Sequence, residues 1–404
     1  MRILILDEWL PIPMDSGKRL RSYELLRRLA GSHDLTWLSP QPDTPDMADQ
    51  ARGIMSSDGF CVETVRAPVL KRSDPRLYLN ALGSMLSPVP YVVALHRSRA
   101  LMDRMAELHR HRPFDLLHVE WTPLAANRPE KWNTPWVVDA HNLEARIWGR
   151  MAQVASAPHA RVFFSLEARR MAAFERKEFQ AADAVIAVSE LERAEIQQLG
   201  GRASTVENGV DLEAFRPTGA EERQVLLFTG ALDWRANVDA VEHFVRDLWP
   251  GVAAACPGWK FQVVGRNPDL QWKARMESAP GVEVHGSVPS IKPFLEKASV
   301  VVVPLRAGGG TRLKILEALA MEKAVVSTSI GAEGLEIVPG EDFLVASSPG
   351  EWVSAIHGLA ASPTRRAALG ASGRRRIEPR YGWDGLSQKL ERVWLGALER
   401  RGSP

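Results

Sequence analysis

Residues 304–334 hold the side chains of this chain that are best suited to bind an anionic ligand. A short apolar run there is followed by three consecutive glycines at 308–310, and then by a pattern that predicts a helix over about residues 312–321. Because glycine has no side chain, its backbone can approach a ligand closely, and the amides at the start of a helix bind phosphate. The residue types therefore predict a phosphate site, with Thr311 as the helix cap, formed by Gly310, Thr311, Arg312, Leu313 and Lys314.

Glu317 lies one to two turns further along the same predicted helix. A carboxylate at this place can accept hydrogen bonds from both hydroxyls of a ribose. A phosphate at the helix start and a ribose beyond it together suggest a nucleoside diphosphate. The alternative is a glycine-rich turn followed by an ordinary salt-bridged glutamate, and the spacing alone leaves both readings open.

Polar residues also follow predicted strands in the first half of the chain. His141 and Glu120 each lie at the end of a short apolar run. A histidine at such a place can bond a sugar hydroxyl or a phosphate, and Glu144 nearby would orient it. Glu120 is a candidate for contacting an acceptor, and Gly17 opens a predicted helix whose amides would meet a phosphate or the acceptor. The alternatives are a structural histidine and a plain strand-to-helix turn.

These residues must be positioned by two sets of short apolar runs. Each run is followed by a loop, and most are then followed by a helical pattern. The runs lie at residues 2–6, 34–38, 116–120, 136–139 and 184–188, and again at 225–229, 261–264, 282–285, 300–304 and 324–327. This alternation predicts an α/β protein with doubly wound parallel sheets, whose strand ends face a ligand. An Asn-Gly pair and a proline indicate a hinge between the sets. The expected parts are an N-terminal domain (1–206), a hinge (207–217), a C-terminal domain (218–380) and a terminal helix (381–404).

The terminal helix has apolar residues at helical spacing, namely Leu386, Leu390, Val393 and Ala397. This spacing allows the apolar face to cross back onto the first domain or to stay on the second. The sequence alone leaves both arrangements open.

The composition is that of a globular protein with nearly balanced charge. Of the 404 residues, 45% are hydrophobic, which excludes general disorder. Lys and Arg number 51 against 49 Asp and Glu, so the net charge of +2 argues against nucleic acid as a partner.

The sequence contains no run of about 18 apolar residues and no secretory signal at its start, so we expect a cytoplasmic protein. Two basic helical patterns, at 18–28 and 96–112, would allow peripheral contact with the inner membrane leaflet, and the alternative is a solvated helix face.

Several short motifs occur in an order that resembles the GT-B glycosyltransferases. The resemblance is to the large retaining group 1 or family 4 type, in a subgroup similar to enzymes of bacterial exopolysaccharide clusters. Besides residues 304–334, the matching pieces are Asp15-Ser16-Gly17, Asp139-Ala140-His141-Asn142, Asn208-Gly209-Val210-Asp211, Thr229-Gly230, Val264-Gly265-Arg266 and His285-Gly286. Two positions depart from the family pattern. Gly309 stands where the family commonly has a glutamate that contacts the donor sugar, and Ala231 stands where many relatives have an arginine.

The resemblance implies a reaction and a set of roles. A sugar would pass from a nucleoside diphosphate sugar to an acceptor hydroxyl with retention of configuration, without a metal or cofactor, between two Rossmann-like domains facing a cleft. The acceptor would be a saccharide, a lipid-linked saccharide or a small molecule in bacterial polysaccharide or glycoconjugate synthesis. The implied residues are His141 and Glu317 for catalysis, Gly17 and Arg235 with the helix start for the diphosphate, Gly308 and Gly309 for the donor sugar, and Gly265, Arg266 and Val288 for the base. Two alternatives stay open: a nucleotide-sugar epimerase of similar fold, and a non-catalytic subunit that binds the nucleotide sugar.

Overall fold

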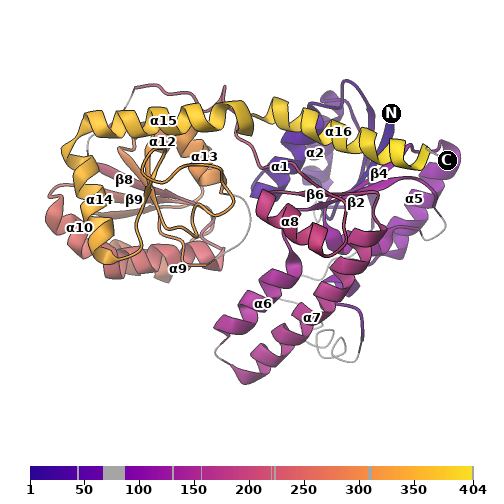
Figure 1. Ribbon diagram of the computed structural model, residues 1–404, viewed down its shortest axis with the longest axis horizontal. Coiled ribbons are helices and arrows are strands. Elements are labelled where there is room, and N and C mark those ends of the chain that lie inside the picture. The colour runs from indigo at the N-terminus through magenta and orange to yellow at the C-terminus, as the bar shows by residue number, and fades with distance from the viewer. Residues whose placement is uncertain are drawn as a thin grey trace. The chain divides into compact units, whose positions relative to one another are not determined.

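The computed structural model divides the chain into two compact units (Figure 1). Unit 1 is Met1–Glu207 together with Leu386–Pro404, and unit 2 is Asn208–Gly385. The structure describes residues 1–42, 45–66, 87–129, 132–155, 157–219, 221–222, 224–307 and 312–402. Each unit is built around a parallel sheet with helices, as the alternating sequence pattern predicts.

Unit 1 contains a seven-stranded sheet in the order β3-β2-β1-β4-β5-β6-β7, in which neighbouring strands are parallel. Its central strands are apolar along most of their length because both faces of such a sheet are covered. Residues 3–6 of the first strand, for example, have no exposed surface. The strands are β1 (Arg2–Leu6), β2 (Asp34–Pro40), β3 (Phe60–Val65), β4 (Leu116–Val119), β5 (Trp136–Ala140), β6 (Ala184–Ala187) and β7 (Ala203–Thr205).

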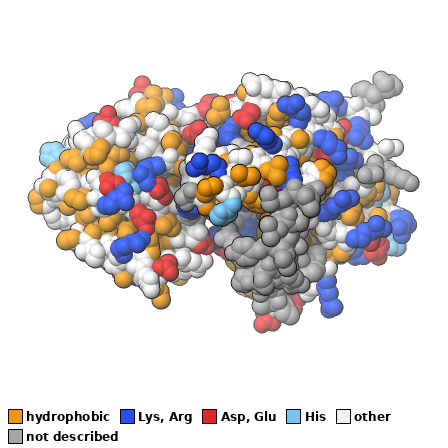
Figure 2. Space-filling model, turned by 90° about the horizontal axis from the view of Figure 1, so that it is seen from below, with side chains coloured by type: hydrophobic (Ala, Val, Ile, Leu, Met, Phe, Trp, Pro, Cys, Tyr) orange, Lys and Arg blue, Asp and Glu red, His pale blue; other side chains and the backbone are white. Residues whose placement is uncertain are grey.

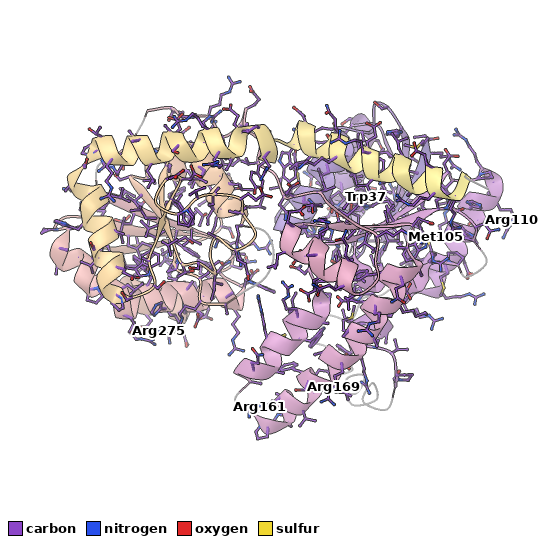
Figure 3. The ribbon with its side chains drawn as sticks, in the orientation of Figure 1. Trp37, Met105, Arg110, Arg161, Arg169 and Arg275 are labelled. Carbon is purple, nitrogen blue, oxygen red and sulfur yellow. The ribbon has the colours of Figure 1, made fainter. Side chains whose placement is uncertain are left out.

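The helices of unit 1 bury apolar side chains, although α1 and α7 also bury some charged ones. On α5, for example, Met105 is buried whereas Arg110 is exposed (Figure 3). Helices α6 and α7 pack on each other as a hairpin that projects from the unit (Figure 1). The helices are α1 (Gly17–Arg27), α2 (Pro45–Ser57), α4 (Tyr91–His96), α5 (Arg99–His111), a 3₁₀ helix (Thr122–Asn127), α6 (Glu144–Val154), α7 (Pro158–Ala181), α8 (Glu190–Gln198) and α16 (Trp383–Gly402).

Unit 2 contains a six-stranded parallel sheet in the order β10-β9-β8-β11-β12-β13. The strands are β8 (Val225–Thr229), β9 (Lys260–Val264), β10 (Val282–His285), β11 (Val300–Val303), β12 (Ala324–Ser327) and β13 (Leu344–Val345). The helices are α9 (Arg235–His243), continued by a π-helical turn (Phe244–Leu248), α10 (Trp249–Ala255), α11 (Leu270–Glu277), α12 (Lys292–Lys297), α13 (Leu313–Ala320), α14 (Pro349–Ala361) and α15 (Pro363–Tyr381). Positive and negative side chains are interspersed over the face of this unit visible in Figure 2, in keeping with the balanced composition.

Each sheet has one place where the strand order reverses. In unit 1 this switch point lies between β1 and β4, and in unit 2 it lies between β8 and β11. Ligands of doubly wound sheets bind outside the carboxyl ends of the strands at such a point, because the two flanking loops leave in opposite directions. The loops after β1, β4, β8 and β11 are therefore the places where site residues are expected.

Helix α16 packs on unit 1, which decides between the two arrangements that its apolar spacing allows. Its residues Leu386, Leu390 and Trp394 are buried. Polar contacts also tie the helix to unit 1: Lys389 pairs with Glu207 at 2.8 Å, and Arg401 pairs with Asp183 at 3.0 Å. The C-terminal residues of the chain thus belong to the same body as its N-terminal strand.

Differences between the predicted and observed elements concern edges and helix starts. The strands β3, β7 and β13 were not predicted, because they are short or partly exposed and carry a weaker apolar signal. Helix α13 begins at Leu313 with Arg312 as its N-cap, whereas the sequence favoured Thr311 for that role. Thr311 itself lies outside the described residues.

The basic stretch at 18–28 does not form the free basic face that the sequence allows. Lys18 is paired with two carboxylates, and Arg21 is buried. Arg27 and Arg28 both pair with Glu24 of the same helix. These cations are engaged within unit 1, and contact of α1 with a membrane stays a prediction. Among the helices in the described ranges, none combines the length and apolarity needed to cross a bilayer.

Helix α13 is held by close contact with α15. An added Cβ at Gly370 would lie 1.8 Å from the backbone oxygen of Glu322, and one at Gly373 would lie 2.4 Å from Leu319. Only glycine lets the two segments approach this closely. The glycines of α15 therefore help to position the helix that carries Lys314 and Glu317.

Replacing Gly370 with alanine should lower the free energy of unfolding by about 1–3 kcal/mol, because the new methyl group overpacks this contact. The matched control is Gly385→Ala in α16, where no atom lies within 4 Å of the added Cβ. That change should raise stability by about 0.5–1 kcal/mol. Urea unfolding followed by tryptophan fluorescence measures both, and equal effects of the two substitutions would contradict the close packing of α13 on α15.

Candidate active site

The switch point of unit 1 holds a half-buried lysine between two acids. Asp7 and Glu8 follow β1, and the Lys18 amine on the first turn of α1 donates to Asp7 Oδ1 at 2.7 Å and to Glu8 Oε1 at 2.8 Å. Burial raises the pKa of Asp7 to about 6 even though Lys18 acts against it. Burial opposes the charge of Lys18, but the two carboxylates outweigh it and raise the pKa of this amine. Gly17, predicted near a phosphate, is the first residue of α1 and directly precedes this lysine.

Arg21, one turn along α1 from Lys18, forms a second buried ion pair. Its guanidinium donates to Asp139 Oδ2 of β5 at 2.8 Å and to the backbone oxygen of Glu207 at 2.7 Å. The other carboxylate oxygen, Oδ1 of Asp139, is buried without a hydrogen-bond partner and lies 3.6 Å from His141 Nδ1. Helix α1 thus links the loops after β1 and β5.

His141 is bound through one ring nitrogen to Glu120. The distance from His141 Nε2 to Glu120 Oε2 is 2.9 Å, and the Ser22 hydroxyl of α1 donates to the same oxygen at 2.6 Å. His118 Nε2 lies 3.0 Å from the other oxygen, Oε1. Burial would raise the pKa of Glu120, but hydrogen bonds from both histidines hold it well below its usual range. Burial would lower the pKa of His141, but Asp139 and Glu120 raise it.

Two predicted roles change with this geometry. Glu144 does not orient His141, because its carboxylate accepts a hydrogen bond from the Trp121 indole at 2.9 Å; Glu120 is the partner of His141 instead. The structure does not support Glu120 as an acceptor contact, because this residue is buried and both of its oxygens are occupied. The sequence predicted Glu144 near the histidine and Glu120 only at a strand end, because side-chain directions depend on tertiary packing.

The ligand atoms of His118, Glu120 and Asp139 lie within 4.8 Å of one another, a spacing that a metal ion could bridge. Hydrogen bonds argue against such an ion. The Trp394 indole N–H can only donate, and it points at His118 Nδ1 at 3.0 Å. In a neutral His118 the proton must therefore be on Nε2, where it donates to Glu120, so this nitrogen has no lone pair for a metal.

In unit 2, Lys314 reaches from α13 toward the end of β8. Its amine donates to Asn237 Oδ1 at 2.8 Å and lies 4.2 Å from the centre of the Phe228 ring. A Cβ at Gly230 would lie 2.8 Å from the same amine, so glycine at 230 makes room for it. Burial and the nearby charge of Arg312 lower the pKa of Lys314 to about 7.

Glu317 lies one turn beyond Lys314 on the same helix. Burial raises the pKa of its carboxyl to about 7, against the lowering effect of Lys314. Among the described residues, no hydrogen bond reaches this carboxylate. The hydroxyl of Thr229, at the end of β8, is likewise buried without a partner in the described part of the chain. The buried Thr229 hydroxyl and the half-buried Glu317 carboxylate are therefore left without a hydrogen-bond partner in the described part of the chain.

The other predicted donor residues lie around the same strand ends. Arg235 is exposed at the start of α9, and Arg266 pairs with Asp233 at 3.3 Å. A Cβ at Gly265 would lie 1.9 Å from the Gly230 oxygen, so the backbone needs glycine here with or without a ligand. Val288 is half-buried against the core of unit 2. Gly308, Gly309, Gly310 and Thr311 lie outside the described residues.

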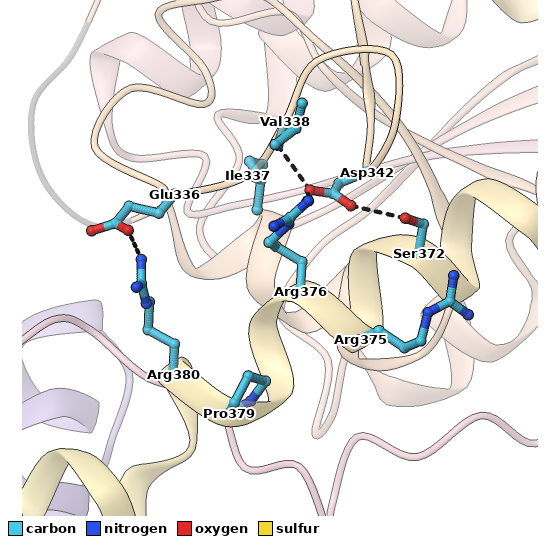
Figure 4. A pocket seen from close by; sticks show the side chains of 9 residues that line it. All are labelled: Glu336, Ile337, Val338, Asp342, Ser372, Arg375, Arg376, Pro379 and Arg380. Atoms are coloured by element: carbon cyan, nitrogen blue, oxygen red, sulfur yellow. Dashed lines mark hydrogen bonds and ion pairs between the residues drawn. The ribbon is translucent and has the colours of Figure 1, made fainter.

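A pocket of about 660 Å³ in unit 2 is not this site (Figure 4). It lies between α15 and the loop at 336–342, and no predicted donor residue in the described part of the chain lines it. Its acids are already engaged: Asp342 accepts from Arg376 and Ser372, at 2.8 and 2.9 Å, and Glu336 pairs with Arg380. The donor residues gather instead at the strand ends.

Sequence reasoning missed Asp7, Glu8, Lys18, His118 and Trp394. The acids at the end of β1 carried a usable signal, since acids at strand ends of such sheets face ligands. The contact from Trp394 to His118 spans 276 positions and had no local signal.

Two protein families match this chain. Residues 16–209 match the family described as "Glycosyl transferase 4-like domain", and residues 223–362 match "Glycosyl transferases group 1". The chain is 27% identical over 344 residues to a D-inositol 3-phosphate glycosyltransferase of Kineococcus radiotolerans, covering 72% of this chain and 74% of the relative. It is 26% identical over 299 residues to the lipopolysaccharide core biosynthesis mannosyltransferase LpcC of Rhizobium leguminosarum, covering 69% and 81%.

Solved structures resemble the chain over nearly its whole length. Sucrose-phosphate synthase from Thermosynechococcus elongatus has a TM-score of 0.73 at 18% identity, covering 99% of this chain and 100% of that chain. Anabaena HepE, solved in complex with UDP and glucose, has a TM-score of 0.64 at 14% identity, covering 97% and 99%. At these identities the likeness shows the shared fold.

Replacing Lys18 with methionine should cost about 3–5 kcal/mol of stability at pH 8, because Asp7 and Glu8 are then buried side by side without a cation. The loss should shrink at pH 5, where Asp7, with its raised pKa, becomes protonated. The neighbouring control Arg19→Met breaks a pair with the half-exposed Asp15 and should cost less than about 1 kcal/mol. Unfolding curves at the two pH values measure both, and a loss that is independent of pH would contradict this account of the cluster.

Proposed function

The chain belongs to the group 1 glycosyltransferases and has their GT-B fold, and on that premise we propose that it transfers a sugar from a nucleoside diphosphate sugar held by unit 2 to an acceptor hydroxyl held by unit 1. The pair Lys314 and Glu317 carries the proposal for the donor. A half-buried amine and a half-buried carboxylate, each with its charge disfavoured, are suited to receive a diphosphate and a ribose. These are the groups that a nucleoside diphosphate supplies together.

The diphosphate is the leaving group of the proposed reaction, and its negative charge grows as the sugar bond breaks. Cations that are already in position stabilise this charge. Lys314 and Arg312 lie at the start of α13, and the exposed Arg235 lies at the start of α9. Because these side chains supply the positive charge, we propose that the reaction needs no metal or cofactor. Retention of configuration is the outcome expected from the resemblance, and NMR of the product would test it.

The acceptor would bind at the switch point of unit 1, near His141. A pocket of about 310 Å³ opens there beside Glu8 and His96, and Arg66, Arg97 and Arg99 also line it. Its arginines favour an acceptor that carries a phosphate or another acid. The names of the two relatives, an inositol 3-phosphate glycosyltransferase and a lipopolysaccharide core mannosyltransferase, are compatible with such an acceptor in bacterial glycoconjugate synthesis. A lipid-linked acceptor would bring the enzyme to the membrane, which stays a prediction.

A thermal-shift screen with UDP, GDP, ADP, dTDP and CDP tests the donor site. One diphosphate should raise the melting temperature saturably and independently of Mg²⁺. Glu317→Gln should weaken that binding about 10-fold, the effect of losing roughly 1.4 kcal/mol of hydrogen bonding to the ribose. Glu341→Gln is the control, because this exposed residue lies in the loop of the other pocket and should leave binding unchanged. No shift with any nucleotide, in a protein that melts cooperatively, would contradict the proposal.

Binding of the diphosphate at pH 8 should be accompanied by uptake of about one proton, because Lys314, with a pKa of about 7, is mostly neutral in the free protein and becomes charged beside the ligand. Glu317 is already ionised at this pH, so it adds little. Calorimetry in two buffers with different ionisation enthalpies measures the uptake. Lys314→Met should bind more weakly and take up no proton, and identical uptake by this variant would show that another group is responsible.

A further inference from the structure

A continuous line of buried hydrogen bonds joins the C-terminal helix to the candidate catalytic histidine. The indole N–H of Trp394 on α16 donates to His118 Nδ1 at 3.0 Å. His118 Nε2 and Glu120 Oε1 are 3.0 Å apart, and Glu120 Oε2 and His141 Nε2 are 2.9 Å apart. All four residues belong to unit 1, and each is buried. We call this line the Trp394–His141 chain.

The hydrogen bonds of the Trp394–His141 chain can have only one order of donors and acceptors when Trp394 is in place. An indole N–H donates and cannot accept, so Nδ1 of His118 must be the acceptor. The neutral His118 then carries its proton on Nε2 and donates it to Glu120. An ionised Glu120 accepts at both oxygens, so the proton shared with His141 Nε2 belongs to the histidine, and the Ser22 hydroxyl donates to the same oxygen.

We propose that α16 sets the ring orientation and proton position of His141 through this chain, which makes Trp394, His118 and Glu120 positioning residues for the transferase reaction. The inference rests on the proposed function for its catalytic meaning, whereas the hydrogen-bond order itself does not. With Nε2 committed to Glu120, the remaining ring nitrogen of His141 is Nδ1, which lies 3.6 Å from Asp139, beyond hydrogen-bond distance. Nδ1 is therefore the nitrogen with which His141 would meet a substrate.

Losing the Trp394 indole N–H should disturb the Trp394–His141 chain, starting at the end farthest from His141. Without that donor, α16 no longer holds the His118 ring in its orientation, although the ionised Glu120 still favours the proton on Nε2. A turned His118 ring would weaken its hydrogen bond to Glu120 and leave that carboxylate without a fixed direction, so His141 would lose part of the interaction that favours its charged form. The other charged groups around His141 are Asp139, Lys18, Glu8 and Glu144, and none of them contacts Trp394 in the described structure.

The variant that tests this is Trp394→Phe, which keeps an aromatic ring against His118 and His33 but removes the donor. We expect kcat for sugar transfer to fall about 10- to 100-fold with little change in KM for the donor, as for a misplaced catalytic group. The control is Trp383→Phe at the start of the same helix, because the Trp383 indole takes no part in the Trp394–His141 chain. An unchanged kcat in a folded Trp394→Phe variant would overturn the proposal.

A second measurement needs no activity. In ¹⁵N-histidine NMR spectra of the wild-type protein without substrate, His118 should be the Nε2–H tautomer, and in Trp394→Phe the titration midpoint of His141 should fall. The proposal would be overturned if His118 were the Nδ1–H tautomer in the wild type, or if the His141 titration were unchanged in the variant. The wild-type spectrum decides the first point even if the variant does not fold well enough for kinetics. If the wild type binds no nucleotide, the proposed function fails, but these spectra still show whether the hydrogen bonds of the Trp394–His141 chain are ordered as proposed.

Discussion

Glu120 is the buried charge on which the arrangement of unit 1 depends. An ionised carboxylate is costly to bury unless hydrogen bonds satisfy it, and the donors here come from three elements: α1 through Ser22, β4 through His118, and the residue after β5 through His141. None of these elements can shift alone without exposing the charge to an apolar core. Helix α16 joins the same network through Trp394.

The switch point of unit 2 differs from that of unit 1 because its charged groups have few partners. It holds a half-buried amine and a half-buried carboxylate on one helix, and the hydrogen bonds of the described residues satisfy the amine only once and the carboxylate not at all. Burial therefore disfavours both charges instead of fixing them. A site of this kind gains free energy when a ligand brings the missing partners, whereas the satisfied network of unit 1 gains little from a ligand and is suited to hold a side chain in place.

Both centres lie where the strand order of a parallel sheet reverses, and this common position follows from the fold. The glycines at 230 and 265 let the loops after β8 and β9 meet within backbone distance, and Gly370 lets α15 press on the turn after α13. Close backbone packing thus places the amine of Lys314 at the end of β8. The chemistry of unit 2 depends on positions where a single methyl group would not fit.

The sequence by itself determined the two sheets, their central strands and the polar residues at the strand ends, because period, apolar runs and turn residues are local signals. Its motifs also predicted His141, which follows β5, and Lys314 and Glu317, which lie on α13, as site residues, and these roles stay predictions. Local signals could not say that Glu120 rather than Glu144 contacts His141. That depends on tertiary contacts: the Trp121 indole donates to the Glu144 carboxylate, and Glu175 of α7 accepts from the Glu144 backbone amide. Nor could local signals show that α16 returns to unit 1 and donates to His118, because a hydrogen bond between residues 118 and 394 exists only once the whole chain has folded.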